Sequence, residues 1–308
     1  MTGFSADWLA LREPCDLAAR ARSADSLALR SLASRLRGAG ALRVLDLACG
    51  TGANLRALAP QLGGSQQWLL IDHDPALLAA LAQHFAAWAR AQGFACRTVA
   101  EGLRLEGAGW RADVVFRRAD LATGLDALPF HAAQLVTASA LLDLVSAAWL
   151  DALLGQALAA NSALLFALTV DGLVEWNEAD ADDDRIHALF SAHQLSDKGF
   201  GPALGTGAPS HVVARLRGPG FTLRQARSDW YIEPSRHAML DAMVHGMAAA
   251  ALEQDASAQA LVHGWKARRL AAIERTSLRV GHVDVLAVPA QGIAARRSRS
   301  HSTSAPIR

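Results

Sequence analysis

The chain has 308 residues, of which 52% are hydrophobic and 19% are charged, and its formal net charge is +1. A chain of this length and apolar content can bury a substantial core, so the composition excludes an intrinsically disordered protein. The near-neutral charge also argues against a nucleic-acid partner, because such a binder needs a basic face to displace counterions.

The sequence shows no signal for a membrane or for export. Its longest apolar runs, such as 246–252, are shorter than the roughly 20 residues of a membrane helix. The N-terminus has neither a basic start nor a cleavage site. Cys15, Cys49 and Cys96 form no C-x-x-C pair, so neither a disulfide framework nor a zinc site is expected. We therefore expect a cytoplasmic protein with reduced thiols, no membrane contact and no metal.

The first half of the chain alternates helices and strands. Residues 7–37 are predicted to form one or two helices that end at Gly38 and Gly40. Short apolar strands then alternate with helical stretches such as 75–91. The expected strands are 43–48, 67–72, 113–118, 134–139 and 163–170. This spacing is typical of βαβ units around a parallel sheet, in which ligands bind beyond the carboxyl ends of the strands.

The second half of the chain is less regular. Residues 171–210 contain the acidic run EADADDD and a glycine-rich piece, and we expect them to leave the sheet as an insertion. The acidic run is interpreted as a solvated loop and not as a metal site. A strand from 221, a helical insertion at 234–275 and a final strand follow. The last 18 residues, 291–308, carry four arginines and no acid, which predicts a disordered basic tail.

The stretch VLDLACGTGANLRAL, residues 44–58, runs from an apolar strand through a glycine turn into a helix. Gly50 and Gly52 allow the backbone to approach a ligand closely, and the helix that follows offers unpaired amide groups. A dinucleotide fingerprint needs a third glycine, but Leu55 stands in its place. The carboxylate of Asp46 would repel a pyrophosphate and attract an ammonium group. The turn therefore favours a nucleotide-type ligand with a positive charge.

The spacing Asp46-x-x-x-Gly50-x-Gly52, followed by WLLIDHDPALL with an acid at the end of the second strand, resembles the class I S-adenosylmethionine-dependent methyltransferases. The resemblance covers about residues 40–170 with ordered motifs and the later strands more loosely. It implies an α/β, Rossmann-like fold whose sheet is mostly parallel and has an antiparallel final strand. It also implies S-adenosyl-L-methionine as the cofactor.

The same resemblance assigns cofactor contacts to residues that follow successive strands. Asp46 would lie near the ammonium of the methionine part, and Asp72 would accept hydrogen bonds from the ribose hydroxyls. His73, Asp120 and Leu121 would lie around the adenine. The full expected set is Asp46, Ala48, Gly50, Gly52, Asn54, Asp72, His73, Asp120, Leu121, Ser139 and Leu141. Each acid alone has a structural alternative, a helix cap or a solvated loop residue, and their common order after successive strands outweighs it.

The methyl acceptor is harder to identify. A sulfonium methyl group is already activated, so the protein mainly has to align a nucleophile and remove its proton. The candidate catalytic residues are Asp143, Asp171, His193 and Lys198, with Trp230, Tyr231 and His282 as further acceptor-side candidates. Taken alone, a lone His or Asp at such a position is more often a helix cap or a surface residue than a catalytic group. No N-P-P-Y-like tetrapeptide follows the fourth strand, which argues against the branch of the family that methylates amino groups of nucleic acids and protein glutamines. Without 291–308 the chain has 26 basic and 29 acidic residues, so its charge also does not favour a nucleic-acid acceptor. A small-molecule acceptor is therefore preferred.

The expected organisation is an N-terminal helical segment, 1–40, followed by a methyltransferase domain, 41–290. The insertions 171–210 and 234–275 would form a helical and loop cover over the acceptor side. Two alternatives stay open: another transferase or a nicotinamide-dependent reductase on the same nucleotide-binding frame, and a non-catalytic regulatory protein that binds the cofactor. The sequence predicts neither the acceptor nor the oligomeric state.

Overall fold

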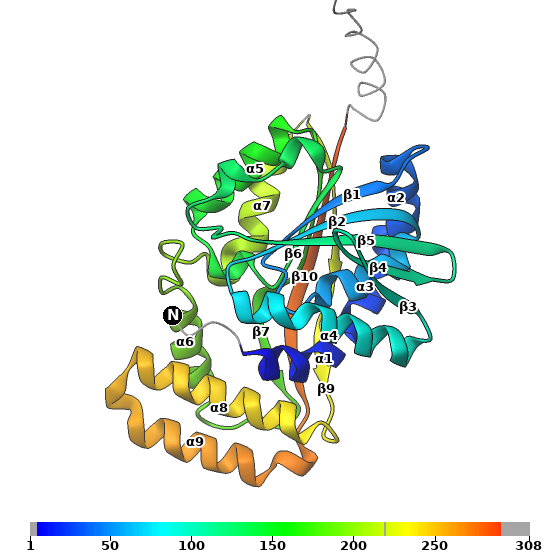
Figure 1. The fold of residues 1–308 in the computed structure, drawn as a ribbon. Coiled ribbons are helices and arrows are strands. Elements are labelled where there is room, and N and C mark those ends of the chain that lie inside the picture. The colour runs from blue at the N-terminus through cyan, green and yellow to red at the C-terminus, as the bar shows by residue number, and fades with distance from the viewer. Residues whose placement is uncertain (1–4, 219, 291–308) are drawn as a thin grey trace, which may run out of the picture.

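The computed structural model describes residues 5–218 and 220–290, so the basic tail expected at 291–308 lies outside the described residues. In this part of the chain ten strands form one sheet (Figure 1). They are β1 (Leu42–Leu47), β2 (Gly64–Asp72), β3 (Ala95–Val99), β4 (Gly102–Gly107), β5 (Trp110–Arg118), β6 (Leu135–Ser139), β7 (Ala163–Trp176), β8 (Phe221–Arg227), β9 (Trp230–Ile232) and β10 (Leu278–Pro289). The order across the sheet is β3-β4-β5-β2-β1-β6-β7-β10-β8, and β9 pairs with β10.

The centre of the sheet is parallel. Strands β5, β2, β1, β6 and β7 pair in parallel, and β10 runs antiparallel between β7 and β8. This confirms the expected mostly parallel sheet with an antiparallel final strand. Strand β1 is buried along nearly its whole length, because Leu42 and Val44 belong to one core cluster and Leu45 and Leu47 to another.

Nine α-helices surround the sheet in the described residues. They are α1 (Ala6–Leu27), α2 (Leu29–Arg37), α3 (Ala53–Leu62), α4 (Pro75–Gln92), α5 (Ala147–Ala159), α6 (Asp183–Gln194), α7 (Ala208–Leu216), α8 (His237–Gln254) and α9 (Gln259–Ala271). Helices α2, α3 and α4 share one core cluster with the sheet, whereas α5 and α7 share a second cluster on the other face. Helices α1, α6, α8 and α9 form a third with the outer part of β7, β9 and the start of β10. No helix in this part of the chain is long and apolar enough to span a bilayer.

Two features of the sheet differ from the sequence analysis. The antiparallel strands β3 and β4 were not expected, because their side chains are mostly half-buried or exposed and include charged residues such as Arg97 and Arg104. Strand β7 also continues to Trp176, six residues beyond the expected end at 170. The reason is its pairing with β10, which reaches Leu278 opposite Trp176.

The acidic run expected to be a solvated loop is part of an ion-pair network between the two insertions. The carboxylate of Asp180 accepts a hydrogen bond from Arg268 Nε at 2.6 Å, and Asp183 forms an ion pair with Arg269. Trp265 Nε1 also donates to Asp183 Oδ1 at 2.8 Å. These contacts tie α6 to α9. Within residues 5–218 and 220–290, no group of His, Cys, Asp and Glu is placed to hold a metal ion.

Gly52 fixes how closely α3 approaches α4. Its φ is +81°, and a Cβ atom built there would lie 2.5 Å from Cζ of Phe85. The ring of Phe85 is fully buried, so it cannot move out of the way at low cost. A glycine is therefore required here by helix packing, in addition to any contact with a ligand.

We predict that Gly52→Ala destabilises the protein more than Gly93→Ala. Gly93 also has a positive φ, +71°, but a Cβ atom there meets nothing within 4 Å. The control should lose only the roughly 1–2 kcal/mol cost of a left-handed L-residue. Gly52→Ala should lose roughly 1–3 kcal/mol more because the added methyl overpacks the core. Chemical denaturation of both variants measures the difference, and equal losses would show that Phe85 does not restrict this position.

Candidate functional site

The turn between β1 and α3 has an unusual backbone. Ala48, Gly50 and Gly52 have φ values of +53°, +53° and +81°. Ala48 is not a glycine, and a positive φ at such a residue is a form of strain that is concentrated at functional sites. The backbone of the turn is thus held in a conformation that the chain would not adopt by local preference alone.

Asp72, at the end of β2, anchors this turn. Its Oδ2 accepts a hydrogen bond from Gly50 N at 2.8 Å, and its Oδ1 accepts one from Asp74 N at 3.0 Å. The cap of α4 is Asp74, whose Oδ1 accepts from Ala76 N at 2.7 Å. Asp72 therefore does not serve as the helix cap. Its carboxylate is oriented by two backbone amides and has further acceptor capacity for a ligand.

Asp46, in β1, is a buried carboxylate with one oxygen left over. Its exposure is 0%, and Oδ1 accepts a hydrogen bond from Asn54 Nδ2 at 2.7 Å. Oδ2 has no hydrogen-bond partner among the described residues. Burial raises the pKa of Asp46, while the hydrogen bond from Asn54 and the charge of Arg20 partly offset this rise. The resulting pKa is about 7. An unpaired buried carboxylate oxygen is costly, so the geometry favours a cationic group beside it.

The other expected cofactor residues lie at the carboxyl ends of β5, β2 and β6. Asp120 is exposed, and its Oδ1 accepts a hydrogen bond from Ala122 N at 2.9 Å, whereas Leu121 is buried. The side chain of His73 is 71% exposed beside Asp72. Beyond β6, Ser139 is followed by a residue of positive φ and then by buried Leu141. The expected set thus lies along one edge of the sheet.

Helix α1 covers this edge, which the sequence analysis did not anticipate. A Cβ atom at Gly50 would lie 3.1 Å from Cδ1 of Leu9 in α1. Two polar ties join α1 to α3: Arg56 Nε and Glu13 Oε1 are 2.5 Å apart, and Arg20 Nη1 donates to Asn54 Oδ1 at 2.9 Å. α1 also contacts α8, so it lies between the turn and the second insertion. The only available sequence signal was the charged residues within an otherwise ordinary N-terminal helix.

Of the candidate catalytic residues, Asp143 is the one best suited to accept a proton. It lies in a short 3-10 helix, Leu142–Leu144, directly after the end of β6. Its Oδ1 is buried and has no hydrogen-bond partner among the described residues. Burial raises the pKa of Asp143, while a backbone hydrogen bond and the charge of Arg12 partly offset this rise. The resulting pKa is about 6. A carboxylate in this range can accept a proton near neutral pH.

The remaining catalytic candidates are held by structural contacts. Asp171 lies inside β7 and forms an ion pair with Arg227, so it is not at a strand end. His193 Nε2 lies 2.9 Å from Glu253 Oε2 of α8. Lys198 donates to the carbonyl oxygen of His193 at 3.3 Å. His193 and Lys198 therefore lie together, whereas no hydrogen bond or ion pair described for Asp171 joins it to them.

The first insertion packs on the segment that follows Asp143. The rings of Phe200 and Trp149 are 5.2 Å apart in an edge-to-face arrangement. Leu204 N donates to Val145 O at 2.8 Å. These contacts place the tip of the insertion at the start of α5, on the side of the sheet where β6 ends.

Of the further acceptor-side candidates, two are structural and one is exposed. Burial lowers the pKa of His282 to about 4, so the ring is neutral near pH 7, and its Nδ1 lies 3.0 Å from Val280 O. Trp230 is buried, and its Nε1 donates to Asp16 Oδ1 at 2.9 Å. Tyr231 is 49% exposed. None of these contacts favours proton transfer.

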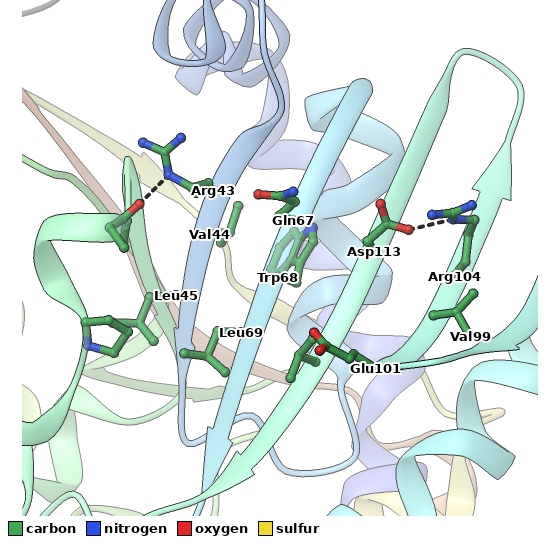
Figure 2. Close-up of a pocket in the computed structure, with 14 residues that line it drawn as sticks. Arg43, Val44, Leu45, Gln67, Trp68, Leu69, Val99, Glu101, Arg104 and Asp113 are labelled. Carbon is green, nitrogen blue, oxygen red and sulfur yellow. Dashed lines mark hydrogen bonds and ion pairs between the residues drawn. The ribbon is translucent and has the colours of Figure 1, made fainter. Parts of the chain in front are cut away.

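A pocket of about 380 Å³ lies away from these residues, on the face of β1, β2, β4 and β5 (Figure 2). Leu45, Leu69 and Val115 are among the residues that line it, and the ion pair between Arg104 and Asp113 lies to one side of Leu45 and Leu69 in Figure 2. The sheet is open here because the chain between β5 and β6 forms only short 3-10 helices, Leu125–Ala127 and Phe130–Ala132. None of the predicted site residues lines this pocket.

Comparison with known proteins gives one family match, over residues 44–123, to a family described as a methyltransferase domain. The matched residues run from β1 to the loop after β5, and they include Asp46, Gly50, Asp72 and Asp120. A comparison with curated proteins gives no match.

Solved structures give more distant matches. An arsenic(III) S-adenosylmethionine methyltransferase from Chlamydomonas reinhardtii is 16% identical with a TM-score of 0.38, and the match covers 82% of this chain and 65% of that protein, less than two thirds of its length. An S-adenosylmethionine-dependent methyltransferase from Geobacter sulfurreducens, solved with S-adenosyl-L-homocysteine, is 16% identical with a TM-score of 0.39 and coverages of 84% and 89%. A cyclopropane-fatty-acyl-phospholipid synthase-like protein from Lactobacillus casei is 17% identical with a TM-score of 0.46 and coverages of 92% and 94%. At these values, none of the three assigns an acceptor to this chain.

The buried state of Asp46 predicts a specific pH dependence of stability. With a pKa of about 7 in the folded protein and about 3.9 in the unfolded chain, the unfolded state releases this proton first as pH rises. Asp46 therefore makes the protein less stable as pH increases from about 4 to about 7, by an amount on the order of a few kcal/mol. Asp46→Asn should remove this contribution. Denaturation of both proteins at several pH values gives the difference, and parallel curves would contradict the buried, protonated carboxyl group.

Proposed function

We propose that this chain, which belongs to the class I S-adenosylmethionine-dependent methyltransferases, transfers the sulfonium methyl group of that cofactor to an oxygen or nitrogen of a small molecule. The observation that carries the proposal is the pair of carboxylates, Asp46 and Asp72, at the carboxyl ends of two neighbouring strands. They flank a turn of positive φ, and Asp46 has a buried oxygen with no hydrogen-bond partner in the part of the chain that the structure describes.

The chemistry of these residues fits the cofactor. The vacant oxygen of Asp46 suits the ammonium of the methionine part, which would supply the positive charge that the buried carboxylate lacks. Asp72 is held by two backbone amides and can accept hydrogen bonds from the ribose hydroxyls. Asp120 and Leu121, at the end of β5, would lie beside the adenine. The cofactor, when bound, supplies an activated methyl group.

The chain's own part in the reaction is alignment and proton removal. Asp143 follows the segment Ser139–Leu141, which we place beside the methionine part of the cofactor. Its pKa of about 6 leaves it ionised at neutral pH and able to take a proton from an oxygen or nitrogen acceptor. The first insertion, with His193 and Lys198 near its tip, would cover the acceptor and exclude water. We leave Asp171 out of proton transfer because Arg227 holds its carboxylate.

The test of this function is a transfer assay on the full chain. Purified protein is incubated with S-adenosylmethionine carrying a deuterated methyl group and with a panel of small phenols, amines and carboxylic acids. The proposal predicts formation of S-adenosyl-L-homocysteine together with a deuteromethylated product. Binding of the cofactor without turnover over the whole panel would favour the non-catalytic alternative.

We predict that Asp72→Ala weakens binding of S-adenosyl-L-homocysteine by roughly 1.5–3 kcal/mol, because the ribose hydroxyls lose a charged acceptor. Asp74→Ala is the matched control. It removes only the cap of α4 and should cost about 1 kcal/mol of stability without weakening the binding of S-adenosyl-L-homocysteine. Titration calorimetry measures both affinities. Equal affinities for the two variants would remove Asp72 from the site.

The role of Asp143 predicts a change in rate without a change in cofactor affinity. Asp143→Asn keeps the shape of the side chain but cannot accept the proton, so turnover should fall by about 100-fold or more. The rate of the unaltered enzyme should rise as pH increases through about 6, since Asp143 must be ionised. This rise should be absent in the variant. An unchanged pH profile in the variant would assign proton removal to another group.

A further inference from the structure

Arg20, in α1, is a buried arginine with one nitrogen left over. It is 3% exposed, and its Nη1 donates to Asn54 Oδ1 at 2.9 Å. Its Nη2 is buried and has no hydrogen-bond partner among the described residues. The same amide of Asn54 donates through Nδ2 to Asp46, whose Oδ2 is also without a partner. A vacant cationic donor and a vacant anionic acceptor thus flank one amide group.

Packing alone does not account for Arg20. Its other neighbour is the buried carboxylate of Asp284, in β10, but Arg20 Nε lies 3.7 Å from Asp284 Oδ2. Asp284 is already satisfied by three shorter hydrogen bonds, from Ser23 Oγ at 2.7 Å, Ser228 Oγ at 2.6 Å and Leu168 N at 2.9 Å. Burying a guanidinium group with an unused donor is unfavourable, so a ligand group that accepts this hydrogen bond would offset the cost.

Arg56 shows what a purely structural arginine looks like in the same place. It also joins α1 to α3 and is also 3% exposed. Its Nε and Nη2 donate to the two carboxylate oxygens of Glu13, at 2.5 and 2.7 Å, and its Nη1 donates to Thr51 O at 2.5 Å. All its nitrogens are therefore used within the protein. In Arg20, by contrast, the buried Nη2 has no hydrogen-bond partner among the described residues.

The two vacant atoms match the two charges of an α-amino acid. We infer that Arg20 Nη2 binds the α-carboxylate of the cofactor's methionine part while Asp46 Oδ2 binds its ammonium. Guanidinium groups are well suited to carboxylates, because the hydrogen bond is charge-assisted at both ends. This inference rests on the proposed function, and it adds α1 to the cofactor-binding elements. The amino-acid end of the cofactor would then lie between β1 and the N-terminal helix.

The test compares ligands that differ only at the amino-acid end. The full chain is titrated with S-adenosyl-L-homocysteine and with its decarboxylated analogue, which keeps the ammonium. Arg20→Met should weaken the binding of S-adenosyl-L-homocysteine by about tenfold or more, which is the effect expected for the loss of one charge-assisted hydrogen bond. It should change the affinity for the decarboxylated analogue much less. Arg56→Met, the matched control, should affect both ligands equally.

The outcomes separate this inference from the proposed function. Equal weakening of both ligands by Arg20→Met would make Arg20 a structural residue of α1, and unchanged binding of both would exclude it from the site. Either result would overturn the inference while leaving the methyltransferase proposal in place. Failure of the unaltered protein to bind S-adenosyl-L-homocysteine would contradict the proposed function itself. If Arg20→Met does not fold, Arg20→Lys keeps the buried charge but cannot reproduce the geometry of the guanidinium group. The selectivity for S-adenosyl-L-homocysteine over the decarboxylated analogue should then fall by a smaller factor, and unchanged selectivity would overturn the inference.

Discussion

The amide of Asn54 is the contact on which the candidate site depends. It accepts a hydrogen bond from Arg20 of α1 and donates to Asp46 of β1 at 2.7 Å and to Thr137 of β6 at 3.1 Å. Thr137 in turn donates to Leu165 O of β7. One side chain at the start of α3 therefore joins two neighbouring strands, β1 and β6, to the N-terminal helix, and Thr137 extends the link to β7. Its orientation is fixed because one end only accepts and the other only donates.

A second buried carboxylate, Asp284 of β10, links β7 to helix α1 beside the candidate site. It accepts the backbone N–H of Leu168, whose φ of +53° is unusual for a residue within a strand. It also accepts from Ser23 of α1 and Ser228, which precedes β9. The irregular register between β7 and β10 lies next to it. Asp284 thus holds the outer part of β7, from which the first insertion leaves, in a fixed relation to α1.

The sequence predicted those parts of the fold that depend on local patterns. The apolar strand before Gly50, the cap at Asp74 and the order of acids after successive strands are readable within short windows. Arg20 and Asp284 were missed because their partners are distant: Ser23 and Asp284 are 261 positions apart, although they share a hydrogen bond. The strands β3 and β4 were missed for another reason, since an amphipathic hairpin at a sheet edge has no continuous apolar run. The proposed acceptor side would combine the two insertions and α1, and no local pattern specifies how such segments pack.

The central claim is that the carboxyl edge of β1 and β2 binds S-adenosylmethionine. Mass spectrometry of the small molecules that remain bound to the purified full chain, followed by calorimetric titration, tests it most directly. The account predicts bound S-adenosyl-L-homocysteine or S-adenosylmethionine, and binding of one molecule of added S-adenosyl-L-homocysteine per chain. Retention of a nicotinamide dinucleotide, with no binding of S-adenosyl-L-homocysteine, would contradict it.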